Sequence, residues 1–462
     1  MNRILTTFLT AVLVSSSSLG ETRTLSLTEC RALSIENNKE LRMARLHEQG
    51  AYYQRKAAFT KYLPKISANG MYMRTGDEIS LLSDEQKNTL SHLGDVVNIP
   101  GLPLNAVGEK LTDALRTDTR NMTAAAIMLT QPVFMGGKIR AYNRITNYAE
   151  QIAGIQTDLQ LQNLIVEVDE TYWKIVELRS KKELAEGYIK LIETLDNDVS
   201  QLIAEGFATK ADGLSVKVKL NEAKVTLIQV DNGLSIMKML MCQLCGLDMD
   251  TDLTLADEMN EDGSDTMPDY ADGSDRAPDK PELRILERAV RIDEEKVKIA
   301  RSEFMPSVVL TGGYMMSNPS VFNSFEKKFK GTWNVGVAVS LPILTWGERS
   351  YKLKEAKTNV MISKFNYEEV CEKIELQVNQ CRKKVDEARE RHAAAVGNRE
   401  EADENLRCAT YGMKEGVIPV SNVIEAQTAW LAAHSDLISA SVNQRLANLY
   451  LLKSLGQINQ SL

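Results

Sequence analysis

The residues from Thr332 to Pro342 alternate without exception between large apolar side chains and small or polar ones. The large positions are Trp333, Val335, Val337, Val339 and Leu341, and the positions between them are Asn334, Gly336, Ala338 and Ser340. Successive side chains of a strand point to opposite faces, so this pattern predicts a strand with one apolar face. About ten residues is also the length that a tilted strand needs to cross a bilayer. A strand of a soluble β-sandwich would alternate in the same way, so the rest of the chain must decide between the two.

Three further stretches carry weaker forms of the same alternation: Ile66–Arg74, Thr123–Gln131 and Ser307–Met315. Each of the four stretches adjoins a proline, a residue that favours strand ends over strand interiors. These prolines are Pro64, Pro132, Pro306 and Pro342. The sequence therefore predicts four strands of membrane-crossing length.

The composition favours long helices over an enzyme core, because 26% of the residues are charged and only 6% are aromatic. Neither a phosphate loop nor a nucleophile with its base is present, and the four histidines have no ligand spacing. We therefore expect no enzyme activity, no cofactor and no metal. Cys242 and Cys245 have the spacing of a redox or metal pair, but they lie within the apolar run 236–247, which favours a buried helix. The redox state of the six cysteines stays open.

The N-terminus predicts export. Residues 1–20 combine the basic Arg3, the apolar run Ile4–Val14 and a small-residue site at 18–20, which is the order of a cleaved signal peptide. Beyond it, no stretch reaches the roughly eighteen apolar residues of a membrane-spanning helix. Only helices and closed barrels satisfy the backbone in lipid, so this chain could enter a membrane only as a barrel.

Long helices follow each predicted strand pair. The first has no proline from 138 to 204, so it could reach about 100 Å at 1.5 Å per residue. It breaks at 205–210 and returns over 211–247. The second spans 349–414, where an apolar seam repeats by four and three between Ile374 and Met413, as in a coiled coil. It breaks at 415–419 and returns over 420–455.

Further segments connect these parts. Helices are expected over Leu25–Phe59 and Pro281–Met305, each before a strand pair, and Gly76–Arg120 is a long polar connection. The stretch 257–275 holds eight acidic residues and no basic one. It is either a loop that binds cations or a partner, or a solvated linker between two halves, which its composition favours.

The two halves are a duplication. Four pairs of landmarks are each separated by 210 residues: Pro132 and Pro342, Gly137 and Gly347, Gly206 and Gly416, Asp212 and Asn422. Pro64 and Pro306 are separated by 242, and the extra 32 residues fall in the connection 76–120. We therefore divide the chain into a signal peptide (1–20), a first repeat (21–256), an acidic linker (257–280) and a second repeat (281–462).

Four strands cannot close a barrel, since known single-chain barrels begin at about eight. Open strand edges are not tolerated in lipid, so several copies would have to share one barrel. Three copies would supply twelve strands, with the long helices packed side by side at one end.

The motifs in this order resemble the TolC family of outer-membrane efflux proteins. They are Leu27–Asn38 (LTECRALSIENN), Tyr62–Ile66 (YLPKI), Gln131–Gly137 (QPVFMGG), Leu341–Gly347 (LPILTWG) and the two helix tips 205–212 and 415–422. The resemblance implies a mainly α fold with a β-barrel part, built from duplicated units of two strands and a long helical hairpin. It implies a trimeric, 12-stranded outer-membrane barrel of a Gram-negative bacterium, continued by a periplasmic α-helical coiled-coil tunnel. It also implies docking to a periplasmic adaptor, which is coupled to an inner-membrane pump of the resistance-nodulation-division or ABC type.

The resemblance gives roles to the two tips. The tip residues that match the adaptor-docking surface of the family are Gly206, Phe207, Thr209, Gly416, Val417 and Pro419. A plain helix-hairpin turn would also need glycine, so both readings stay open. Relatives carry acidic rings at the closing end, and the matching positions here are Asn422 and Glu425, to which Asp212 could add. A threefold ring of Glu425 would favour cations. Asn422 departs from the acidic pattern, and a solvated helix-face charge is the alternative for Asp212.

The function so implied is a passive conduit for small molecules such as drugs and toxic compounds. On strand four, Trp333, Val335, Val337, Val339 and Leu341 would face lipid, and the small residues between them would line the lumen. The outer-membrane duct of a type I protein secretion system is an alternative with the same fold. An exported coiled-coil structural or adhesion protein is an alternative of another class.

Overall fold

The computed structural model describes residues 23–76, 82–97, 99, 101–114, 120–259, 280–321 and 327–458. The contacts divide the chain into two compact units. Unit 1 takes its described residues from 1–49, 152–287 and 366–462, and unit 2 takes them from 50–151 and 288–365. Both units therefore draw on both repeats of the sequence. The signal peptide and nearly all of the acidic linker lie outside the described residues.

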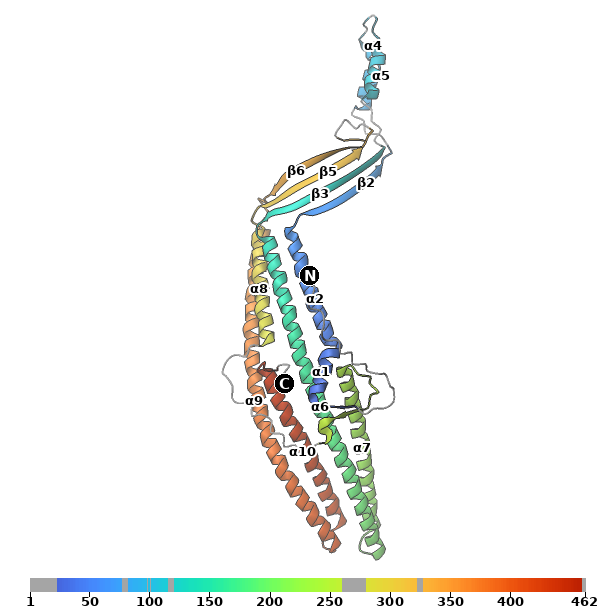
Figure 1. The fold of residues 1–462 in the computed structure, drawn as a ribbon, viewed down its shortest axis with the longest axis vertical. Coiled ribbons are helices and arrows are strands. Elements are labelled where there is room, and N and C mark those ends of the chain that lie inside the picture. Colours follow the sequence, from blue (N-terminus) through green and yellow to red (C-terminus); the bar gives the residue numbers. More distant parts are fainter. Residues whose placement is uncertain are drawn as a thin grey trace, which may run out of the picture. The chain divides into compact units, whose positions relative to one another are not determined.

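Unit 2 contains one sheet of four strands in the order β2-β3-β5-β6, with every neighbouring pair antiparallel (Figure 1). The strands are β2 (Lys65–Arg74), β3 (Asn121–Met135), β5 (Ser307–Asn318) and β6 (Lys330–Ser340). β3 of the first repeat pairs with β5 of the second, so the two halves share the sheet. The outer edges of β2 and β6 have no strand partner within the described chain.

The register gathers most of the large apolar residues of the four strands on one face, whereas Met71, Met128 and Val309 lie on the other. Ile66 lies opposite Leu129, Leu129 opposite Gly312, and Gly312 opposite Val335. Directly opposed residues of an antiparallel pair project from the same face. On the other face, a row of directly opposed residues runs from Lys65 through Thr130 and Thr311 to Gly336. One face of the sheet is thus largely apolar, while the other carries mainly small and polar residues.

Strand β3 corrects one expected boundary. The sequence predicts its end at Gln131, before Pro132, but β3 continues to Met135, with a register shift between Pro132 and Phe134. The residue left without a partner at this bulge is Val133, and Pro132, which has no N–H to donate to the ladder, lies beside it opposite Val309. Leu341, expected at the end of the fourth strand, follows the last residue of β6.

The polar connection 76–120 is more ordered than its composition suggested. It contains α3 (Asp84–Ser91), α4 (Leu93–Val96) and α5 (Leu104–Ala114). Ser83 and Gln86 form a capping box that starts α3, with the Gln86 N–H donating to Ser83 Oγ at 3.2 Å. The sequence predicts only a loop here, because helices of two or three turns within a polar segment give weak periodicity.

The remaining elements are mostly helical. They are β1 (Arg23–Leu25), α1 (Leu27–Asn37), α2 (Lys39–Phe59), η1 (Thr60–Tyr62), α6 (Lys138–Glu205), α7 (Lys210–Cys245), β4 (Leu253–Leu255), η2 (Ala256–Met259), α8 (Pro281–Ser302), α9 (Glu348–Lys414) and α10 (Val420–Ser454). The helix expected over 25–59 is two helices, because Asn38 interrupts it and caps the second by accepting from the Leu41 N–H at 3.0 Å. None of the described helices is long and apolar enough to cross a membrane.

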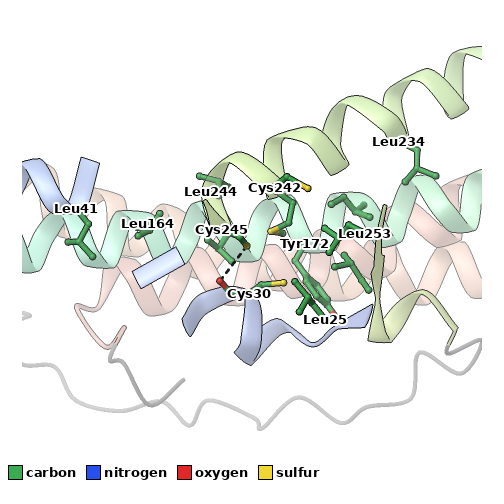
Figure 2. Packing of buried hydrophobic residues seen from close by; sticks show 14 residues of the cluster. Leu25, Cys30, Leu41, Leu164, Tyr172, Leu234, Cys242, Leu244, Cys245 and Leu253 are labelled. Carbon is green, nitrogen blue, oxygen red and sulfur yellow. Dashed lines mark hydrogen bonds between the residues drawn. The ribbon is translucent and has the colours of Figure 1, made fainter. Parts of the chain in front are cut away.

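Unit 1 holds three clusters of buried apolar side chains. The first joins α1, α6 and α7 with the two-stranded parallel sheet of β1 and β4 (Figure 2). It includes Cys30, Cys242 and Cys245, all fully buried, so the buried-helix interpretation of the cysteine pair is confirmed. Asp257, the first residue of the acidic linker, accepts a 2.5 Å hydrogen bond from the Tyr172 hydroxyl beside this cluster.

The second cluster joins the α6–α7 hairpin to the α9–α10 hairpin near their tips. The seam that the sequence placed on α9 is its buried side. Its buried members are Ile374, Val378, Val385, Ala395, Ala409 and Met413. The helices of unit 1 are therefore held by coiled-coil packing, as their periodicity predicted.

Candidate functional site

The first hairpin tip is a tight turn that exposes one large apolar side chain. Gly206 follows the last residue of α6 in the left-handed region (φ +84°), which favours glycine. The N–H groups of Phe207 and Ala208 both donate to the Leu202 carbonyl, at 2.8 and 3.2 Å. The phenyl ring of Phe207 is left 81% exposed.

The second tip repeats this geometry 210 residues later. Gly416 has a φ of +74°, and the N–H groups of Val417 and Ile418 donate to the Gly412 carbonyl at 2.9 and 3.0 Å. Val417 is 80% exposed. The duplicated tips thus hold matching apolar side chains, Phe207 and Val417, out into solvent.

The two tips fill the same internal space with residues of opposite size. The first places Leu202 beneath Ala208, whereas the second places Gly412 beneath Ile418. A Cβ on Gly412 would lie 2.5 Å from the Ile418 Cδ1 atom, so this glycine is needed to admit the isoleucine. The two tips therefore have the same backbone turn but reverse which of the two positions holds the larger side chain.

Two expected site residues of the first tip serve a local purpose. Thr209 caps α7 in a capping box with Asp212, whose carboxylate accepts from the Thr209 N–H at 2.9 Å and from its hydroxyl at 2.6 Å. These hydrogen bonds hold the pKa of Asp212 below its usual value. At the second tip Pro419 begins α10 without a side-chain cap. The structure therefore gives Asp212 a capping role.

Asn422 and Glu425 lie on the exposed side of the first turns of α10, three residues apart. Ser421 contacts the Asn422 side chain at 3.4 Å. The Glu425 carboxylate has no ion-pair or hydrogen-bond partner within the part of the chain that the structure describes. A carboxylate held on a rigid helix without an internal partner is available to a neighbouring molecule or to solvent ions.

Helix α7 carries two apolar seams, which sequence reasoning missed. One faces the core and includes Val216, Ala223 and Leu234. The other is exposed, and its members are Leu214, Val218, Val225, Ile228, Ile236 and Met239. The exposed members are separated by three, four, seven or eight residues, which keeps them on one side of the helix, so this seam has the spacing of a second coiled-coil contact. The spacing of these apolar residues was present in the sequence. Because the two seams alternate along the helix, however, together they gave only the pattern of one apolar helix.

Four of the five residues expected to face lipid, Trp333, Val335, Val337 and Val339, project from the apolar face of the sheet, and the fifth, Leu341, follows the end of β6. Their exposed fractions lie between 54% for Leu341 and 75% for Trp333. A contiguous apolar surface of this kind on a single chain marks an interaction site. Nothing in the described residues covers it.

The electrostatics of unit 1 are dominated by structural ion pairs. The buried Glu177 on α6 accepts from Lys174 at 2.8 Å, from Lys181 at 2.7 Å and from Ser439 of α10 at 3.0 Å. Burial raises the pKa of Glu177, but the lysine hydrogen bonds outweigh it and leave the pKa below its usual value. No group of three or more potential metal ligands occurs among the described residues.

A family model described as outer membrane efflux protein matches residues 31–237 and 278–457, which is most of the chain. The chain belongs to the outer membrane efflux protein family. Each matched segment lies mostly within one of the two repeats, and the gap between them, 238–277, contains the acidic stretch 257–275. Among curated proteins, no relative matches this efflux-family chain.

Solved structures of efflux-family channels share the fold. The CusC transmembrane channel is 15% identical with a TM-score of 0.74, over 96% of this chain and 95% of CusC. The CmeC outer membrane channel of Campylobacter jejuni is 16% identical with a TM-score of 0.73, over 94% of this chain and 87% of CmeC. VceC of Vibrio cholerae, an outer membrane protein, is 14% identical with a TM-score of 0.72, over 93% of this chain and 96% of VceC. The mainly helical fold with its four-stranded sheet is therefore that of these channels.

Proposed function

We propose that this efflux-family chain is the outer-membrane exit duct of a tripartite efflux system. It would conduct small toxic molecules passively from a periplasmic adaptor and an inner-membrane pump to the exterior. The observation that carries this proposal is the sheet of unit 2, which combines one exposed apolar face with two unpaired edges.

The sheet can meet lipid only if its edges are paired. Unpaired N–H and C=O groups are not tolerated in the hydrocarbon region, and single-chain barrels begin at about eight strands. If β6 of one copy pairs with β2 of the next, three copies close a barrel of twelve strands. The apolar face would then point to lipid, and the small and polar face to a water-filled lumen.

The second seam of α7 supports an assembly of several copies. A helix with apolar stripes on two sides packs between two neighbours, but the described chain supplies a neighbour for only one of them. A helix from the adjacent copy would cover Leu214, Val225 and the other exposed seam residues. The helices of three copies would then form a continuous periplasmic tunnel.

The tips are proposed to dock with the adaptor, and Glu425 to ring the closing end. Phe207 and Val417 are apolar, exposed and held by glycine turns, so they can be covered at little conformational cost. Three copies would bring three Glu425 carboxylates around one axis, which favours cations.

Single-channel conductance in a planar bilayer tests this function. The purified protein should give discrete steps with cation preference, and Glu425→Ala should reduce that preference. Glu390→Ala, which removes an exposed carboxylate from the middle of α9, serves as the control and should leave it unchanged. A protein that never conducts and fractionates away from the outer membrane would contradict the proposal and favour a coiled-coil structural protein.

A further inference from the structure

Unit 2 contains a cavity of about 340 Å³ between the β3–α6 turn and the end of α8. Its wall includes Gly136 and Gly137 of the turn, the first residues of α6, and the last two turns of α8. Gly136 lets the turn approach α8 closely, because a Cβ there would lie 2.7 Å from the Ser302 carbonyl oxygen. The cavity is therefore built by a contact that another residue at 136 would disrupt.

Four cationic side chains and one buried carboxylate line this cavity. Glu295, which is only 4% exposed, binds Arg144 at 3.2 Å and Lys298 at 2.7 Å through Oε1. Its other oxygen, Oε2, is buried and has no hydrogen-bond partner. An unpaired oxygen of a buried carboxylate is unfavourable unless a donor completes it.

The other two cations are Arg140 and Arg301, both exposed and facing the same cavity. Neither has an ion-pair or hydrogen-bond partner within the part of the chain that the structure describes. Arg140 lies in the first turn of the 68-residue helix α6, where unpaired backbone N–H groups and the helix dipole also attract anions. The cavity thus combines an anion-binding side with the carboxylate of Glu295, whose second oxygen has no donor among the described residues.

We propose that this cavity binds the zwitterionic headgroup of an aminophospholipid. The phosphate lies between Arg140 and Arg301, since guanidinium groups bind phosphate oxygens by charge-assisted hydrogen bonds. The primary ammonium group donates to Oε2 of Glu295. A phosphoethanolamine-type group carries both charges on a short linker, so it matches both sides of the cavity at once.

The surroundings favour a lipid over a soluble phosphate ester. Met305 belongs to the cavity wall and is 48% exposed. Phe304 beside it, and Val133 and Phe134 before the turn, are exposed apolar residues that acyl chains could cover. This step rests on the proposed function, in which the adjoining apolar sheet face meets the membrane.

The second repeat does not reproduce the site. Its equivalent turn has Trp346 and Gly347, and Ser350 stands where the first repeat has Arg140. Arg349 there is already used, since it donates to the Thr345 hydroxyl at 3.0 Å and to the Glu303 carbonyl at 3.1 Å. The inferred site is therefore a property of the first turn and not of the duplicated fold in general.

Native mass spectrometry of the full-length protein in detergent tests the inference. Phosphatidylethanolamine should bind at least about tenfold more tightly than phosphatidylcholine, which has no N–H donor, or phosphatidylglycerol, which has no ammonium group. The double variant Arg140→Gln with Arg301→Gln should bind phosphatidylethanolamine about tenfold or more weakly than the unaltered protein. Lys357→Gln with Lys364→Gln removes two exposed charges of α9 in unit 2 as the control, and should leave binding unchanged.

Glu295→Gln separates the two halves of the headgroup. It should abolish the preference for phosphatidylethanolamine while phosphatidylglycerol still binds. Equal binding of all three lipids to the unaltered protein, or insensitivity to the arginine changes, would overturn the inference. So would binding of soluble glycerophosphoethanolamine as tightly as the lipid. Conductance measured on the same preparation distinguishes the two proposals, because a conducting protein without lipid preference refutes only this one.

Discussion

The two units of this chain are stabilised in different ways. Unit 1 contains all three apolar clusters found among the described residues, together with the buried Glu177 ion pairs. Unit 2 holds a sheet whose strands are joined by backbone ladders, but whose apolar side chains remain exposed. Coiled-coil seams let the helices bury one another within the chain, whereas the sheet has no facing layer.

This difference indicates what each unit needs from outside. A sheet with an uncovered apolar face is not stable alone in water, since one buried face is usually required. In the proposed assembly, unit 2 would obtain this cover from lipid and from strands of other copies, while unit 1 would use another copy only to cover the second seam of α7. Changes to the sheet should accordingly have larger effects on assembly than changes to the helices.

The largest effect is expected from a charge on the apolar sheet face. Val337→Lys should destabilise the assembled barrel by about 2–4 kcal/mol per chain, because lysine at mid-membrane faces lipid. The neighbouring Ala338→Lys points to the lumen and serves as the control. Heat-modifiable migration of outer-membrane fractions measures both. If the two variants assembled equally well, the assignment of the faces would be wrong.

A smaller effect is expected from the exposed seam of α7. Val225→Glu should weaken association between copies by about 1.5–3 kcal/mol per contact, the value of burying a valine. Thr226→Glu adds the same charge to an exposed position of α7 that lies about 100° around the helix from Val225 and outside the seam. Analytical ultracentrifugation in detergent compares them. Unchanged association of Val225→Glu would show that the seam is not an interface.

Within unit 1, removal of the Glu177 charge should cost on the order of 1–2 kcal/mol at pH 7, because two lysine hydrogen bonds lose their charged acceptor. The pKa of Glu177 is lowered by folding, so its contribution is present above the unfolded pKa of about 4.3 and is lost as the pH falls through the lower folded pKa. Thermal unfolding of Glu177→Gln should therefore differ from that of the unaltered protein at pH 7, and the difference should shrink as the pH falls below the unfolded pKa and through the lower folded pKa. Glu193→Gln, exposed on the same helix, should show no such convergence.

The smallest effects concern two glycines of α9 and its turn. Gly416→Ala places a side chain in the left-handed region and should destabilise the second tip by about 1 kcal/mol. Gly397→Ala, in the middle of the helix with open space around its Cβ position, should stabilise by about 0.5–1 kcal/mol. In chemical unfolding, the two variants should change the free energy of unfolding in opposite directions. Equal signs would contradict the role given to the Gly416 turn.

The parts of the fold that follow strict periodicity were predictable from sequence. The alternation around Val337 reflects one apolar face of the sheet and the four-three spacing on α9 reflects one buried side of the helix, and both appear in the structure. Features that depend on partners distant in sequence were not. The bulge at Pro132 depends on pairing with β5, and the cavity at Glu295 joins residues about 150 positions apart.

The candidate site was predictable only in part. Glycine followed by an exposed apolar residue marked both tips correctly as turns, because local backbone chemistry dictates them. The capping use of Asp212 could have been read from the spacing of Thr209 and Asp212, which is that of a capping box. That Leu202 and Ala208 of the first tip correspond to Gly412 and Ile418 of the second could be recognised only once the hydrogen bonds of the two turns were known.

The mass of the detergent-solubilised particle tests the central claim most directly. If β6 of each copy pairs with β2 of the next, native mass spectrometry should show three chains, and Val337→Lys should reduce the fraction of that species. A stable single chain or dimer, with the sheet edges free and the apolar face uncovered, would contradict the shared barrel on which this account depends.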